Sequence, residues 1–174
     1  MTRLINIFGG PGVGKSTVIA GLYHYMKLQH INVEVAHEVA KDYVWEGQLN
    51  ILHHDQLLVF AQQHRRIYRL MNKVEYIIVD CPLLMCIPYI AEGFLKGLEP
   101  LIVESHHTFD SQSFVLNRSD AVYNPKGRYH TESESIAKHK EIVDVLIKYD
   151  IPYTEIDVGP EAPKKIISLL YPYL

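Results

Sequence analysis

Hydrophobic and polar positions divide this chain into short apolar runs and longer amphipathic stretches. The short runs are too brief for helices, and most of them end at a glycine, an aspartate or an asparagine, which is typical of buried strands. We expect five strands, at residues 4–8, 32–36, 76–79, 113–116 and 153–158. The second is the weakest, because Glu34 interrupts its apolar run.

In the longer stretches, apolar residues recur every three or four positions, which indicates helices with one buried face. We expect these helices at residues 15–30, 53–71, 87–94, 100–107, 131–149 and 162–170. The longest pattern, 53–71, predicts an apolar face made of Leu57, Phe60, Ala61, His64, Ile67, Tyr68 and Met71. The helix after Thr131 has a strong start, because Glu134 completes a capping box.

Alternating strands and helices predict an α/β fold with a parallel sheet covered on both faces. The length of 174 residues suits one domain, residues 1–174. Right-handed crossovers then bring the carboxyl ends of the strands to one edge, where ligands bind. The residues that follow these strand ends are a glycine-rich loop, Glu38, Asp80 and Arg118.

The glycine-rich loop carries the most specific motif. Residues 9–16 read G-G-P-G-V-G-K-S and match the phosphate-binding pattern G-x-x-x-x-G-K-[ST] between a strand and a helix. Its backbone N–H groups and the helix N-terminus suit phosphate oxygens, with Lys15 reaching the β- and γ-phosphates and Ser16 holding Mg²⁺. The predicted nucleotide-binding residues are Gly9, Gly12, Val13, Gly14, Lys15, Ser16, Thr17 and, from a later loop, Arg118.

Asp80 ends the clearest apolar strand, the usual place for the acidic residue that supports the Mg²⁺ site. It could instead act as a general base toward an acceptor. A purely structural role is the third interpretation, since Pro82 makes a turn here and Asp80 could cap it.

The residues that would bind the molecule accepting the phosphoryl group are marked by less specific patterns. Glu38 could accept a proton from an acceptor hydroxyl or hydrogen-bond to it, or it could be a solvated loop charge. One arginine of the 53–71 helix could grip a phosphate or sugar, although a solvated basic face explains the same pattern. Aromatic side chains after Glu38 could stack a base, or simply belong to the core. The candidate acceptor-binding residues are Glu38, Asp42, Tyr43, Arg65 and Arg66, with Trp45 as a further aromatic candidate.

Residues 118–130 are polar and interrupt the periodic pattern. We expect a lid that closes over ATP and brings Arg128, or Lys126 or Arg118, to the transferring phosphoryl group. Arg128 is the preferred catalytic candidate. The alternative is an ordinary surface loop.

Composition and charge bear on whether the protein binds nucleic acid, spans a membrane or holds a metal. The chain is 48% hydrophobic with a net charge of −3, so no overall positive field recruits nucleic acid, although a local basic groove remains open. No apolar run is long enough for a membrane span, and we expect a reduced, cytoplasmic chain without a signal peptide. The histidine pairs and two cysteines lack the spacing of a metal site.

These features together resemble small nucleoside or nucleotide kinases of the P-loop class. Within that class the chain is most similar to the AAA_28-type family, which includes the nicotinamide-riboside kinase domain of bacterial NAD-biosynthesis regulators and many phage proteins. The resemblance rests on residues 9–17, on 38–42, on the strand ending at Asp80 and on Gly127-Arg128. It implies a five-stranded parallel sheet in the order 2-3-1-4-5, ATP with Mg²⁺, an acceptor between Glu38 and Asp80, and Arg128 as the lid arginine. It leaves the acceptor open, because Cys81-Pro82 stands where deoxynucleoside kinases carry Arg-Ser.

The first functional hypothesis is therefore an ATP-dependent kinase for a nucleoside, a nucleoside monophosphate or a hydroxyl of a modified base. The second is an ATPase or GTPase switch acting on a protein or nucleic-acid partner, although no Asn-Lys-x-Asp motif for GTP is present. A nucleotide-binding module without catalysis is the third, and the intact Lys15, Ser16 and Asp80 argue against it. A homodimer is a possible assembly.

Overall fold

A computed structural model describes residues 1–118 and 131–171. Five parallel strands form one sheet in the order β2-β3-β1-β4-β5, as the resemblance implied. Their register places Ile5 of β1 opposite Ile78 of β3 and Gln112 of β4. The strands are β1 Arg3–Phe8, β2 Val33–Ala36, β3 Tyr76–Val79, β4 Ser111–Asn117 and β5 Thr154–Asp157. All five predicted strands are confirmed, with ends that differ by at most two residues.

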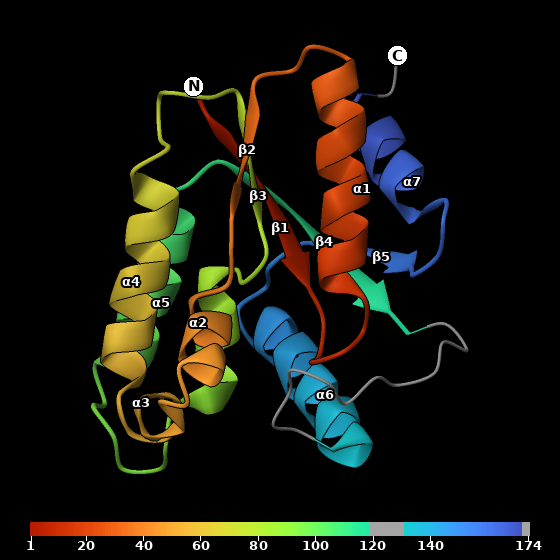
Figure 1. Ribbon diagram of the computed structural model, residues 1–174. Helices are drawn as coiled ribbons and strands as arrows, with labels where there is room; N and C mark the ends of the chain where they lie inside the picture. Colours follow the sequence, from red (N-terminus) through yellow and green to blue (C-terminus); the bar gives the residue numbers. More distant parts are fainter. Residues whose placement is uncertain (119–130, 172–174) are drawn as a thin grey trace.

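Helices cover both faces of the sheet (Figure 1). Helices α1 and α7 pack on one face, against Ile5 and Ile7, whereas α4, α5 and α6 pack on the other, against Leu4 and Phe8. This alternation along β1 is the period of two expected of a strand buried on both sides. The helices described are α1 Lys15–Leu28, α2 Val39–Trp45, α3 Leu49–His54, α4 Gln56–Tyr68, α5 Leu98–His107, α6 Glu132–Lys148 and α7 Ala162–Leu170, with the 3₁₀ helix η1 Leu83–Tyr89.

The prediction of one helix over residues 53–71 is wrong. The chain forms α3 and then α4, and it breaks at Asp55, whose side chain accepts a hydrogen bond from the backbone N–H of Leu58. The buried face is also rotated: Leu57 and Tyr68 are exposed, while Gln56 and Gln63 are buried. Apolar periodicity misplaced this face because two buried positions carry amides that hydrogen-bond to backbone groups.

Two other segments differ from the sequence prediction. The helix expected at 87–94 is instead the 3₁₀ helix η1, which begins four residues earlier and contains Pro88. The segment after Glu38, for which the periodic pattern predicts no element, forms the short helix α2 with Glu38 as its N-cap residue. Such short helices give little periodic signal and are held by tertiary packing. By contrast, the capping box of Thr131 and Glu134 is confirmed. No helix in the described ranges is long and apolar enough to cross a membrane.

His106 of α5 gives a testable pH dependence. It is buried, and burial together with the nearby His107 lowers its pKa from 6.5 to about 4. The unfolded chain therefore binds the proton more tightly, so the stability due to neutral His106 is complete above pH 6.5 and is lost as the pH falls toward 4. We expect this residue to lower the free energy of unfolding by roughly 2 kcal/mol between pH 7 and pH 5.

Urea unfolding of His106→Leu at these two pH values measures the effect. The variant should lose this part of the pH dependence, whereas His107→Leu, at an exposed neighbouring position, should keep most of it, because burial is the larger cause of the lowered pKa of His106. An unchanged pH dependence in His106→Leu would contradict the assignment.

Candidate functional site

The phosphate-binding loop connects β1 to α1 at the carboxyl edge of the sheet. Gly14 precedes α1 with φ of 108°, a conformation that side chains other than glycine rarely adopt. A Cβ atom there would also lie 2.9 Å from Cγ1 of Val158, so the position has no room for a side chain. This geometry opens the N-terminus of α1, which begins at Lys15, toward the loop.

Lys15 is buried and folds back over its own loop. Its Nζ donates to the carbonyl oxygen of Gly9 at 2.9 Å and to that of Gly10 at 3.4 Å. These bonds hold the ammonium group at the loop, where a bound phosphate would present stronger, charged acceptors.

Helix α6 supports the same loop from the other side. The backbone N–H of Gly10 donates to Nδ1 of His139 at 3.2 Å, and the hydroxyl of Ser135 donates to the carbonyl oxygen of Pro11. A Cβ atom at Gly10 would lie 2.6 Å from the carbonyl oxygen of Ser135, so only glycine allows this approach. Sequence reasoning missed both α6 residues, because no motif marks them and the contact spans more than 120 positions.

The environment of His139 favours its neutral form. Burial first, and then the charges of Lys15 and Arg118, lower the pKa of this imidazole. A neutral ring leaves Nδ1 free to accept the hydrogen bond from Gly10, which a doubly protonated ring could not do.

Arg118, predicted to bind nucleotide, directly follows β4 and contacts the start of α6. It donates to Glu132 at 2.8 Å and to the hydroxyl of Ser135 at 3.1 Å. Through Ser135 it is therefore connected to the phosphate-binding loop. The predicted lid residues Lys126 and Arg128 lie outside the described residues.

Asp80 lies directly after β3 and is 4% exposed. Its Oδ1 is buried without a hydrogen-bond partner. A buried carboxylate oxygen without a partner is unfavourable by itself and suits a bound cation. Asp80 and Ser16 line the same cavity, together with Glu38 and Asp42. Carboxylate and hydroxyl oxygens are ligand types that Mg²⁺ accepts, so the lining of this cavity is compatible with the predicted metal site, which stays a prediction.

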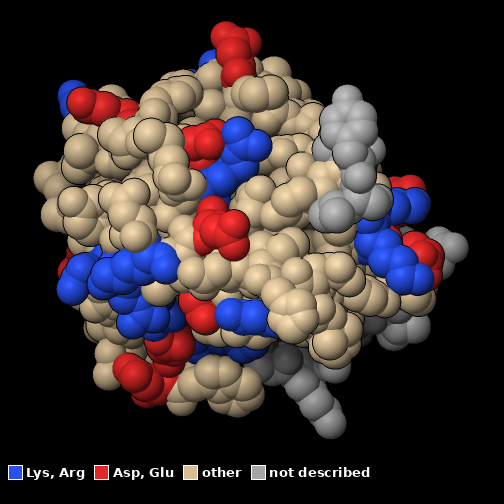
Figure 2. Space-filling model, turned by 90° about the horizontal axis from the view of Figure 1, so that it is seen from above, with Lys and Arg blue, Asp and Glu red and all other residues tan. Residues whose placement is uncertain are grey.

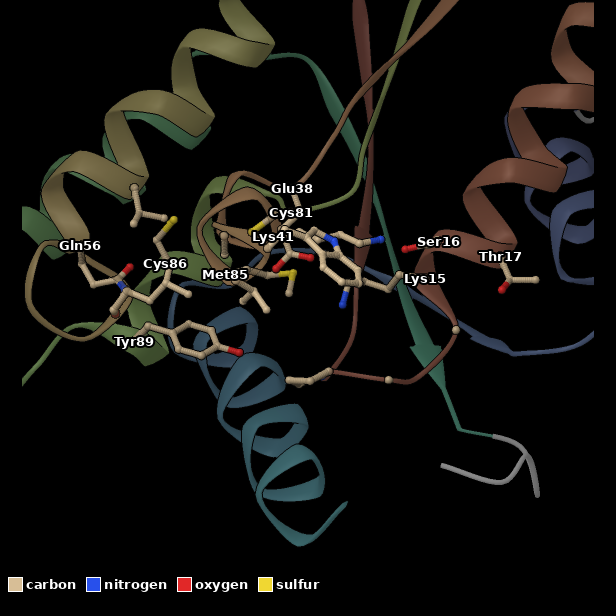
Figure 3. A pocket seen from close by; sticks show the side chains of 18 residues that line it. Lys15, Ser16, Thr17, Glu38, Lys41, Gln56, Cys81, Met85, Cys86 and Tyr89 are labelled. Carbon is tan, nitrogen blue, oxygen red and sulfur yellow. The ribbon is translucent and has the colours of Figure 1, made fainter. Parts of the chain in front are cut away.

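A second cavity of about 270 Å³ begins at the phosphate-binding loop and runs under α2 toward α4 (Figure 3). Lys15 and Ser16 lie at one end and Gln56 lies at the other, with Glu38 and Cys81 between them. Apolar and aromatic side chains form much of its wall, including Trp45, Leu52, Val59, Met85 and Tyr89. The volume is near the lower end of the roughly 300–1,000 Å³ typical of small-molecule sites.

Both cysteines line this wall. A hydrogen bond with Cys86 and then burial raise the pKa of Cys81 well above its usual value. Cys81 is therefore not an activated nucleophile. Across the described ranges, no cluster of three or more histidine, cysteine or acidic side chains could hold a metal ion.

The remaining residues predicted to bind the acceptor differ in whether they line a cavity. Arg66 donates to the carbonyl oxygens of His37 and Glu38, each at 3.2 Å, and pairs with Asp42. It thus holds the Glu38 turn from behind and does not line either cavity. Arg65 is exposed outside both cavities, and Tyr43 is buried with its hydroxyl donating to Gln62 at 2.9 Å. Trp45, 70% exposed, does line both cavities.

Charge elsewhere on the molecule is mixed. The face at the amino ends of the strands, opposite the phosphate-binding loop, carries interspersed acidic and basic side chains (Figure 2). Among the described residues of this face, therefore, no broad surface of one sign would attract a polyanion.

The AAA_28 family model, which describes an AAA domain, matches residues 4–162. The chain belongs to this family. As a P-loop domain of the AAA_28 family, the protein binds a nucleoside triphosphate. No curated protein sequence is significantly similar to this AAA_28 chain.

Solved structures support the fold of this AAA_28 domain. The crystal structure of NadR protein in complex with NR has a TM-score of 0.69 and 17% identity, covering 99% of this chain and 51% of the NadR chain. NadR protein in complex with NAD and AMP-PNP has a TM-score of 0.68 and 16% identity, over 99% and 49%. The protein therefore spans about half the length of the NadR chains that it matches.

Proposed function

We propose that this protein is an ATP-dependent kinase that transfers the γ-phosphoryl group to a hydroxyl of a small nucleoside-like acceptor. The observation that carries this proposal is the continuity of one cavity from the phosphate-binding loop to an apolar, aromatic-lined end. A nucleotide switch needs a site for its nucleotide alone. This cavity extends past the phosphate-binding loop into an apolar end, which offers a small molecule a place beside the phosphates.

The residues at the mouth of this compartment have the chemistry that transfer requires. Lys15 would neutralise charge on the β- and γ-phosphates, and Ser16 with Asp80 would hold Mg²⁺, which supplies further charge neutralisation when bound. Glu38 lines both cavities and would orient the acceptor hydroxyl or accept its proton, with Asp80 as the alternative base. Arg128 is proposed as the lid arginine.

The charges in the cavities favour a nucleoside over a nucleoside monophosphate. Among their described lining residues, the lysines and arginines are Lys15 and Lys41 only. Arg66 is instead paired with Asp42, so it is poorly placed to grip an acceptor phosphate. The NR ligand of one NadR structure and the AMP-PNP of the other are consistent with a nucleoside beside ATP.

A direct test is to incubate the protein with ATP, Mg²⁺ and a panel of nucleosides, nucleoside monophosphates and nicotinamide riboside. We expect at least one nucleoside to gain the mass of one phosphoryl group, and monophosphates to react at least tenfold more slowly. ATP consumption should be low until that acceptor is added. Steady ATP hydrolysis with no phosphorylated product on any acceptor would contradict the kinase proposal and favour a switch.

A further inference from the structure

Gln56 is a buried polar residue in the wall of the apolar compartment. It is the first residue of α4, is 4% exposed and lies at the end of the cavity farthest from Ser16 and Thr17 (Figure 3). Buried amides in such surroundings normally satisfy both their donor and their acceptor groups. Gln56 therefore raises the question of what each end of its amide binds.

The donor end is accounted for. Nε2 of Gln56 donates to the carbonyl oxygen of Leu52 at 2.6 Å. Leu52 lies in the last turn of α3, where backbone carbonyls have no partner within the helix. Because a carbonyl oxygen can only accept, this bond fixes the orientation of the amide, with Nε2 toward Leu52 and Oε1 away from it.

The acceptor end is the group that Gln56 can offer to an occupant of the cavity. No described side chain or backbone group donates a hydrogen bond to Oε1. Its near neighbours in the wall, Leu52 and Val59, carry no side-chain donor, and Val59 follows Gln56 by one helical turn. A carbonyl oxygen in an apolar wall discriminates strongly between occupants that donate a hydrogen bond to it and occupants that do not.

We propose that Gln56 selects the acceptor by accepting a hydrogen bond from an N–H group on its ring. The acceptor class is then a flat heterocyclic nucleoside that carries a carboxamide or an amino group at the end opposite the reacting hydroxyl. The flat ring follows from Trp45, Met85 and Tyr89 in the wall, since aromatic and thioether groups pack well against ring faces. This inference rests on the proposed function only in assigning the compartment to the acceptor.

Binding of matched nucleoside pairs tests the assignment independently of phosphoryl transfer. Titration calorimetry with AMP-PNP and Mg²⁺ present would compare nicotinamide riboside with nicotinic acid riboside, and adenosine with purine riboside. Within each pair, only the first member carries the N–H donor. For the wild type we expect about tenfold tighter binding of the donor-bearing member of at least one pair.

Two variants at Gln56 should shift this ratio in opposite directions. Gln56→Met removes the acceptor oxygen and should bring the ratio to less than twofold. Gln56→Glu keeps an acceptor and adds negative charge, so the preference for the amide over the carboxylate should persist or grow. Gln62→Met is the matched control: it also removes an amide that forms one hydrogen bond on α4, with Tyr43, but outside both cavities. Its ratio should equal that of the wild type.

Each outcome bears on the inference. Equal ratios in the wild type and Gln56→Met, a preference for the partner without a donor, or no binding of any pair to the wild type would overturn it. If Gln56→Met does not fold, the response of Gln56→Glu decides, and a loss of preference there overturns it too. Phosphoryl transfer, followed in parallel by mass, separates the two proposals. Donor-dependent binding without phosphoryl transfer supports the role of Gln56 and contradicts the kinase proposal. Phosphoryl transfer together with an equal binding ratio in the wild type and Gln56→Met supports the kinase proposal and contradicts the role of Gln56.

Discussion

Replacing Lys15 by methionine should lower kcat/KM for phosphoryl transfer by about 10³-fold while leaving the fold intact. Methionine keeps most of the length and the apolar stem of lysine but lacks the ammonium group. In the structure that group is buried at the loop and donates to the carbonyl oxygens of Gly9 and Gly10. The loss of these bonds should reduce the free energy of unfolding by only about 1–2 kcal/mol.

The titration of His139 distinguishes loss of charge from collapse of the loop. The positive charge of Lys15 is one cause of the lowered pKa of His139, and burial is the larger one. In Lys15→Met the pKa of His139, followed by NMR, should therefore rise but stay below 6.5. A pKa at or above 6.5 would instead show that α6 has separated from the loop.

Lys27→Met is the matched control, because Lys27 is an exposed residue in the last turn of α1 and pairs with Glu34. It should retain both the activity and the pKa of His139. Activity of Lys15→Met within tenfold of the wild type would contradict the assignment of the phosphate-binding loop.

The parts of the site that the sequence predicted are those whose signal is local. Gly14, Lys15 and Ser16 belong to one contiguous motif whose backbone conformation follows from its glycines. The position of Asp80 directly after β3 was predictable because an apolar strand and its end are also local features. Parallel pairing then brings these separate strand ends to one edge, which the topology confirms.

The parts that the sequence missed depend on contacts between distant segments. Arg66 was a candidate for binding the acceptor, but the structure places it against the backbone of Glu38 and against Asp42. Gln63 likewise accepts a hydrogen bond from the backbone N–H of Val39 at 3.0 Å, so α4 holds the Glu38 turn at several points. An arginine that grips substrate and one that supports a turn have the same sequence pattern, and only the packing of α4 against α2 distinguishes them.

The two buried glutamines of α4 are a further feature that the apolar pattern of the sequence does not predict. Gln56 and Gln63 lie on the inner face of α4, where a periodicity of apolar residues assigns no polar group. Each is buried because its amide bonds a backbone group, Leu52 or Val39, that would otherwise lack a partner. The rotation of the predicted buried face of α4 and the failure to single out Gln56 therefore have one physical cause.

Asp80→Asn should separate the two roles left open for this aspartate, metal ligand and general base. If Asp80 supports Mg²⁺, removing its charge should lower kcat/KM by about 10²–10³-fold and weaken the response to the metal. The nucleotide-free protein should be as stable as the wild type or up to about 1 kcal/mol more stable, since Oδ1 is buried without a partner. Asp144→Asn, at an exposed position on α6, is the control for loss of one negative charge.

Thermal unfolding with AMP-PNP, measured with and without Mg²⁺, reads the metal response without catalysis. The wild type and Asp144→Asn should gain additional Tm from Mg²⁺, and Asp80→Asn should lose most of that gain. Glu38→Gln supplies the complementary result. Because Glu38 is the proposed base or orienting residue, this substitution should reduce kcat but keep the increase in Tm caused by Mg²⁺. A full Mg²⁺ response in Asp80→Asn combined with a collapsed kcat would reverse the assignment, making Asp80 the base. Loss of the response in both variants would mean that the two carboxylates, which line the same cavity as Ser16, hold the metal together.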